Sequence, residues 1–289
     1  MRKKPGHHPQ AHLEGLRQRV PADGETAGPR LRIGSGAEGL ERLEASFTGQ
    51  AFSPHRHDTY AIGMTLTGVQ TFRYRGERRH CLAGEGHILH PDELHDGGAG
   101  TEEGFGYRIL YVDPSLVQQA LDGKPLPFVA DPVVKHHDMD PALIACLNDI
   151  DEPIGDCERV EIALVIAGVL EKHSSAPRNK RVPLCMASLL RVRDLIADDP
   201  MIQHPVKEFE RVSGLDRWTI ARQFRAAFGT SPSRFRTMRQ LDLARLMIIG
   251  GMPLRDAALE AGFADQSHLS RMFKRTYGLT PARWAAALT

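Results

Sequence analysis

The sequence predicts two domains of different class, an all-β domain followed by an all-α domain. Its 289 residues are enough for two domains of ordinary size. Short apolar runs separated by glycines at turn spacing fill residues 40–113, whereas helical periodicity dominates everything after residue 183. The charge also changes sign between the two halves of the chain, which supports a division near residue 177.

The β pattern is clearest at residues 65–74 and 107–112, where apolar and polar side chains alternate. Many short strands with glycine turns are typical of a small barrel or sandwich. Beyond this region the period becomes helical, and two helices are expected at residues 141–151 and 157–173. These helices would be appended to the β domain.

The domain boundaries follow from composition. Residues 1–35 are rich in Pro, Gly, His and charge and lack periodicity, so we expect a disordered tail. The β region and its helices then form one domain over residues 36–175. Residues 176–183 are polar and contain a proline, which predicts a linker, and residues 184–289 form the helical domain.

The charge distribution indicates which kind of partner each domain binds. Residues 1–177 carry 18 Lys and Arg against 26 Asp and Glu, whereas residues 178–289 carry 19 against 10. Only the C-terminal part is therefore expected to bind a polyanion. The four cysteines lack CxxC or zinc-finger spacing, and no apolar run reaches the ~20 residues of a membrane span. With no apolar secretion signal either, we expect a cytoplasmic protein without membrane association.

The helical domain contains one sequence twice. Residues 222–235 read RQFRAAFGTSPSRF, and residues 271–284 read RMFKRTYGLTPARW. Each copy predicts a helix that stops at a glycine, Gly229 or Gly278, and restarts at Ser/Thr-Pro. A short helix, a glycine-containing turn and an aspartate N-cap precede each copy. This order predicts two helix-turn-helix modules.

The second helix of each module, residues 217–228 and 266–277, is expected to expose a basic face, because its apolar residues at i, i+4 and i+8 face inward. Arginine can read guanine through two hydrogen bonds, and the other side chains can reach base edges or phosphates. Arg222 and Arg271 occupy matching positions, which indicates a shared DNA contact. The expected DNA-binding residues are Arg217, Trp218, Thr219, Arg222, Arg225, Gln266, Ser267, His268, Arg271 and Lys274.

Residues 184–289 resemble the tandem helix-turn-helix domain of AraC-type (AraC/XylS family) transcription regulators. The second module carries the stronger match, AGFADQSHLSRMFKRTYGLTP at residues 261–281. The first module departs from the family at Glu210, where a small residue is usual, so this side chain must point outward or tilt its helix. The resemblance implies that the two exposed helices enter successive major-groove segments, roughly 34 Å apart on one face of the duplex.

Histidines gather in two segments of the N-terminal domain, HRHDTY at residues 55–60 and HPDELH at residues 90–95. This domain resembles the cupin-like sensor domain of AraC-type regulators. In cupin barrels an HxH pair, a later histidine and a carboxylate bind a divalent metal. The usual glutamate after the HxH pair is missing, so a metal-free effector pocket is favoured over a metal site or purely structural histidines. The expected effector-binding residues are His55, His57, Tyr60, His95 and Tyr107.

The resemblance implies a regulator of transcription and not an enzyme. Its expected partners are double-stranded operator or promoter DNA, a small-molecule effector, RNA polymerase, and a second copy that docks through residues 141–173 in a homodimer. Neither a cofactor nor a metal is expected. The alternative is a metal-dependent cupin enzyme with an accessory DNA-binding domain, which would contain stoichiometric metal.

Overall fold

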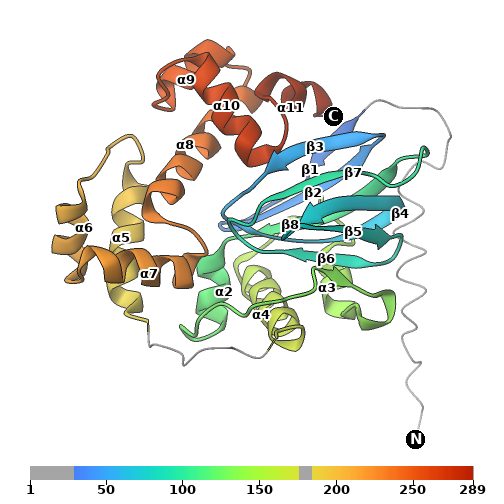
Figure 1. Ribbon diagram of the computed structural model, residues 1–289, viewed down its shortest axis with the longest axis horizontal. Helices are drawn as coiled ribbons and strands as arrows, with labels where there is room; N and C mark the ends of the chain where they lie inside the picture. The colour runs from blue at the N-terminus through green and yellow to red at the C-terminus, as the bar shows by residue number, and fades with distance from the viewer. Residues whose placement is uncertain (1–28, 176–183, 289) are drawn as a thin grey trace, which may run out of the picture.

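The structure is a computed structural model that describes residues 29–175 and 184–288. It confirms the predicted fold class, because a β barrel with appended helices is followed by an all-helical domain (Figure 1). The expected linker and most of the expected tail lie outside the described residues. Residues 30–33, which we expected in the tail, form a strand because Leu31 is buried in the apolar core and the strand pairs with its neighbour.

Nine antiparallel strands form the barrel. They are β1 (Arg30–Ile33), β2 (Leu40–Phe47), β3 (Gln50–His55), β4 (Tyr60–Tyr74), β5 (Glu77–Leu82), β6 (Gly86–Leu89), β7 (His95–Ala99), β8 (Phe105–Val112) and β9 (Val133–Val134). The long strand β4 joins the two faces of the barrel. Its first half pairs with β6 and β8, and its second half pairs with β5 and β7. Strand β3 pairs with β7, and this pairing places His55 opposite His95.

Helices α2 (Pro114–Ala120), α3 (Pro141–Cys146) and α4 (Asp156–Lys172), with the short turn η1 (His136–Asp138), cover one side of the barrel. Helix α4 confirms the second appended helix within one residue at each end. The first appended helix is shorter than expected. The segment after Cys146 leaves the helix, and the buried guanidinium of Arg108 takes up the carbonyl groups of Leu147 and Asn148 there.

The helical domain contains α5 (Met186–Asp198), α6 (Val206–Ser213), α7 (Arg217–Phe228), α8 (Pro232–Ile249), α9 (Leu254–Glu260), α10 (Gln266–Tyr277) and α11 (Pro281–Ala287). Helices α7 and α10 have the predicted bounds. Asp216 and Asp265 accept hydrogen bonds from backbone N–H groups of the first turn, as N-caps do. Gly229 and Gly278 end the helices with φ of 70° and 73°, a left-handed conformation that favours glycine.

The unusual Glu210 points outward and caps the next helix. Its Oε1 atom accepts a hydrogen bond from the backbone N–H of Arg217 at 3.0 Å, at the start of α7. A carboxylate near a helix N-terminus is favourable because the helix dipole is positive there. The residue therefore fits the first module without entering its core.

The two modules pack differently on the barrel. The first module has a core of its own, built from α5, α7 and the start of α8. The second module shares one core with the barrel, in which Leu43 and Ile109 join Leu241 and Phe273. Figure 1 accordingly shows α10 and α11 beside β1 and β3, and α7 beside α2.

Both glycine stops of the repeated sequence touch the barrel. A Cβ atom added to Gly229 would lie 2.5 Å from Cβ of Pro91, and one added to Gly278 would lie 2.9 Å from Nδ1 of His55. The carbonyl of Gly278 also accepts a hydrogen bond from the backbone N–H of Ser53 at 3.1 Å. The barrel thus contacts the C-terminal end of each exposed helix.

Candidate functional site

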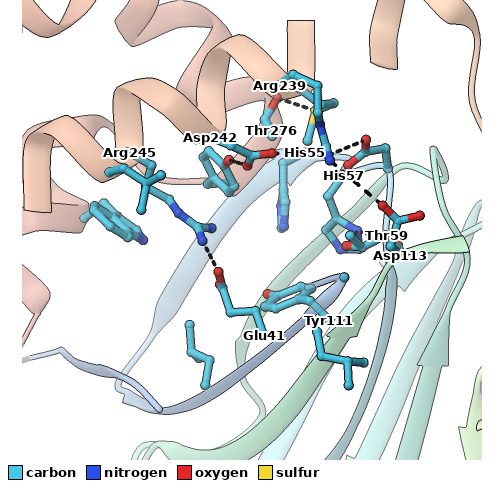
Figure 2. Close-up of a pocket in the computed structure, with 18 of the residues that line it drawn as sticks. Glu41, His55, His57, Thr59, Tyr111, Asp113, Arg239, Asp242, Arg245 and Thr276 are labelled. Carbon is cyan, nitrogen blue, oxygen red and sulfur yellow. Dashed lines mark hydrogen bonds and ion pairs between the residues drawn. The ribbon is translucent and has the colours of Figure 1, made fainter. Parts of the chain in front are cut away.

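A cavity of about 430 Å³ lies between the barrel and the helical domain. Barrel strands form one wall, and α8, α10 and α11 form the other (Figure 2). Apolar side chains from both domains line it, among them Leu43, Tyr111, Met238 and Trp284. The volume is in the range of small-molecule sites, which are concave and largely apolar with a few polar groups.

Charged side chains cross the cavity from one domain to the other. Arg239 of α8 lies 3.0 Å from Asp58 of the barrel and 3.2 Å from Asp242, with Asp113 farther away at 3.9 Å. A second pair joins Arg245 of α8 to Glu41 of β2. Figure 2 shows this pair, and Arg239 near Asp113 on the barrel side. Ion pairs across an interface fix the register of the two surfaces.

Burial shifts the pKa values of the carboxyl groups that line the cavity. Desolvation raises the pKa of Asp58 to about 7, although Arg239 opposes the shift, and burial raises the pKa of Asp242 as well. Four carboxylates, including Asp113 and Glu41, face two guanidinium groups. The cavity therefore offers no excess positive charge to a ligand.

Three buried histidines meet at the barrel end of the cavity. One ring nitrogen of each of His55, His57 and His95 lies within 4.8 Å of one nitrogen of each of the others. His55 ends β3, His57 follows it, and His95 begins β7, so the strand pairing brings them together. Burial lowers the pKa of His57 to about 3 and that of His95 to about 4, and the pKa of His55 also falls well below its ordinary value.

The structure brings most of the expected effector residues together. His55, His57 and Tyr107 line the cavity, and His95 joins through the histidine cluster. The prediction for Tyr60 was wrong, because its side chain does not line the cavity. Its ring packs 5.2 Å from that of His90, within the separate core that the barrel shares with α2 to α4.

The expected DNA-binding residues lie on α7 and α10, and most are exposed. Among the exposed large apolar side chains of the described residues, Trp218 is the most exposed, with 75% of its surface accessible. Thr219 and His268 are half-buried. The Thr219 hydroxyl donates to the N-cap Asp216 at 2.7 Å, so its hydrogen is already engaged. Arg225 instead faces the barrel and forms an ion pair with Asp92 at 3.1 Å.

Sequence reasoning missed the helical wall of the cavity. Arg239, Asp242 and Arg245 lie on α8, and none of them was among the expected site residues. Their spacing of three residues places successive charges near one side of a helix. That pattern was available in the sequence, but nothing in it indicated which surface the charges would face.

Comparison with known proteins identifies both domains. Residues 39–165 match the family model described as the AraC-like ligand binding domain, and residues 210–287 match the helix-turn-helix domain. The chain belongs to the AraC-type transcription regulators. Like them it carries a ligand-binding domain before its DNA-binding domain. No helix within the described parts of the chain has the length and apolar character to span a membrane.

Relatives of this AraC-type regulator are themselves named as regulators. The transcriptional regulator YbfI of Bacillus subtilis is 23% identical over 225 residues, which cover 76% of this chain and 82% of YbfI. The transcriptional regulator ExsA of Pseudomonas aeruginosa is 32% identical over 79 residues, 27% of this chain. The match spans only 28% of the length of ExsA.

Solved structures share the two-domain fold. ToxT from Vibrio cholerae superposes with a TM-score of 0.61 at 12% identity, over 87% of this chain and 99% of ToxT. A structure of ToxT bound to an unsaturated fatty acid gives a TM-score of 0.59 at 13% identity, over 93% of this chain and 98% of ToxT. At such low identity the likeness shows the fold alone.

Proposed function

We propose that this AraC-type regulator binds specific operator DNA through α7 and α10, and that a small molecule in the interdomain cavity controls this binding. The observation that carries the proposal is that the cavity walls come from both domains. A ligand there contacts barrel and helices at once, so it can favour one relative position of the two. This function would place the protein in the cytoplasm with its DNA.

The DNA contacts are proposed from exposure and position. Arg222 and Arg271 project from matching positions of α7 and α10, and both are exposed. Each can reach a guanine in the major groove, while Lys274 is suited to phosphates. Arg225 would have to leave its ion pair with Asp92 to reach a phosphate. The differing neighbours, Trp218 in one module and Ser267 in the other, would read two different half-sites.

The DNA proposal is tested by binding assays with promoter fragments at fixed salt. Arg222→Ala and Arg271→Ala should each weaken binding by about 5- to 150-fold, the cost of one bidentate base contact. Arg78→Ala, which removes an exposed arginine of β5, is the matched control and should change affinity little. Footprinting that shows no preference for any genomic site over random DNA would contradict the proposal.

The cavity also suggests a class of effector. ToxT has been solved with an unsaturated fatty acid, a carboxylate with an apolar chain. The cavity here is lined largely by apolar side chains, but Asp58 and Asp242 accompany the two arginines. We therefore propose an effector with an apolar body and a neutral or cationic polar group.

An alkylamine and an alkyl carboxylate of equal chain length test this class in metal-free buffer. The amine should raise the unfolding temperature more, because a carboxylate would add negative charge beside buried acids. Thermal unfolding with each probe gives the comparison. A larger shift with the carboxylate would exclude the proposed charge preference.

A second copy is the proposed protein partner. Helix α4 exposes Val160 and Leu164, one turn apart, with 50% and 55% of their surfaces accessible. Exposed apolar side chains spaced by one helical turn suit helix pairing. Leu164→Glu should shift the protein toward monomer in sedimentation velocity, and an unchanged dimer fraction would count against α4. RNA polymerase remains a candidate partner through the family alone.

A further inference from the structure

Three arginines surround one carboxylate of the barrel. Asp92 lies between β6 and β7, and its side chain is only 5% exposed. Its carboxylate lies 3.1 Å from Nη1 of Arg225 in the last turn of α7, and 2.8 Å from Nε of Arg234 in the first turn of α8. The third arginine, Arg56 of the barrel, lies 3.9 Å away. In the described part of the chain no other carboxylate pairs with any of the three, so positive charge is in excess here.

The carboxylate of Asp92 fits these arginines imperfectly. Its Oδ1 atom and Nε of Arg234 are both buried, and neither has a hydrogen-bond partner among the described residues, although the two atoms lie 2.8 Å apart. The contact is therefore an ion pair without a hydrogen bond, and a buried donor left unpaired costs free energy. Asp92 also has φ of 60°, an uncommon conformation for a residue other than glycine.

This arginine cluster lies beside the proposed DNA-binding face of α7. Arg225 follows the proposed base contact Arg222 by three residues, so the two side chains project from neighbouring positions on the helix. Gly229, which ends α7, contacts Pro91, so the barrel segment that carries Asp92 lies against the junction of α7 and α8. The N-terminus of α8 adds partial positive charge to this junction. A phosphate bordering the groove that α7 enters would meet the same arginines.

Arginine binds phosphate as it binds a carboxylate, through paired N–H donors. We propose that Arg225 and Arg234 form a site for a backbone phosphate of duplex DNA, and that Asp92 occupies this site as an internal competitor while the two domains are in contact. DNA must then displace Asp92 before both arginines can contact the backbone. The inference rests on the proposed DNA binding through α7, and it adds a means by which the barrel restrains that binding.

The competition couples DNA binding to the contact between the domains. A site that is competent in only a fraction of the molecules shows an affinity reduced by that fraction. Removing the charge of Asp92 should therefore tighten DNA binding by the factor that its ion pairs contribute, about 5-fold for an exposed pair and about 30-fold for a partly buried one. By linkage, DNA should in turn release the barrel segment from the arginines.

The experiment measures binding of the full-length protein to a random-sequence duplex at fixed salt. Such a duplex offers backbone phosphates without an operator, so the result depends neither on specific recognition nor on an effector. Asp92→Asn should bind it about 5- to 30-fold more tightly than the wild type does. Glu93→Gln is the matched control, because it removes one negative charge from the same segment but breaks a pair with Arg75 instead. The control should change the affinity little.

A second substitution separates competition from simple undocking. Arg234→Ala breaks the same ion pair and loosens the same contact between the domains, but it also removes part of the phosphate site. It should therefore bind the duplex no more tightly than the wild type, and it should cancel most of the gain when combined with Asp92→Asn. If Arg234→Ala bound as tightly as Asp92→Asn, the barrel would only block access to the helices, and the proposal would fail.

The wild-type protein provides a test that needs no variant. The backbone N–H groups of Ser53 and Arg56 donate to carbonyls at the end of α10, and a saturating amount of the duplex should speed their hydrogen exchange because Asp92 no longer holds the domains together. Unchanged or slower exchange, or an Asp92→Asn variant that binds no tighter, would overturn the proposal. The proposed function would survive that result if footprinting of the wild type still showed specific genomic sites.

Discussion

The attachment of the helical domain to the barrel should depend on one carboxylate, that of Asp92. Its side chain is only 5% exposed and lies 2.8 Å from Nε of Arg234 and 3.1 Å from Nη1 of Arg225. Asp92 has φ of 60°, a left-handed conformation that asparagine also tolerates. Asp92→Asn therefore removes the charge while keeping the shape and the backbone.

The size of the effect follows from exposure. Arg225 keeps 59% of its side chain exposed, so its pair with Asp92 contributes about 0–1 kcal/mol. Arg234 is 23% exposed, so breaking its ion pair with the buried Asp92 should cost more than the ~1 kcal/mol of an exposed pair and less than the about 3–5 kcal/mol of a fully buried one. Loss of about 2 kcal/mol corresponds to roughly a 30-fold shift toward the undocked state.

Hydrogen exchange measures this shift of the docking equilibrium directly. The backbone N–H groups of Ser53 and Arg56 donate to carbonyls at the end of α10, so they exchange when the domains separate. In Asp92→Asn both N–H groups should exchange with solvent about 30-fold faster, provided that the separated domains re-associate faster than an exposed N–H group exchanges. Glu93→Gln is the control, because Glu93 pairs with Arg75 inside the barrel. Unchanged protection in Asp92→Asn, or equal acceleration in the control, would show that Asp92 does not hold the domains.

Three further predictions concern stability. Gly278→Ala should lower the free energy of unfolding in urea by well over ~1 kcal/mol, because the new Cβ would collide with His55. Gly251 is also left-handed but has open space around it, so Gly251→Ala should lower the free energy of unfolding by only about 1 kcal/mol. Arg108→Met should cost about 3–5 kcal/mol, since it removes a buried ion pair, and a loss below ~1 kcal/mol would refute this role. Burial lowers the pKa of His90 to about 4, so the folded state stays neutral where the unfolded state binds a proton. Stability is therefore lost as pH falls below about 6.5, by about 2 kcal/mol at pH 5, and His90→Gln should lose correspondingly less between pH 7 and pH 5.

Features set by neighbouring residues were predictable from the sequence. The bounds of α7 and α10 agree with prediction, because Asp216 and Asp265 cap their starts and glycines end them. The chemistry of a helix end lies within a few residues, so one sequence suffices to find it. The histidines of the barrel were recognised for the same reason, as short motifs.

Features that depend on distant packing were not predictable. The ion pair of Arg239 with Asp58 joins residues 181 positions apart, and neither residue signals its partner. Tyr60 was expected to line the cavity because it lies near the HxH pair, but the direction of its side chain is decided by the core it joins. The role of Glu210 was likewise open until its hydrogen bond to the start of α7 was seen.

The contact of both glycine stops with the barrel has a consequence for the choice of operator. Gly229 contacts Pro91, between β6 and β7, and Gly278 contacts His55 at the end of β3, so two separate segments of the barrel support the two exposed helices. In the proposed DNA complex, the separation of these two segments would set the axial offset and the angular phase of the helices on the duplex. Under the proposed function, a displacement of one segment relative to the other would change which half-site spacing fits, and the sensor domain would select promoters by their geometry as well as alter affinity for one.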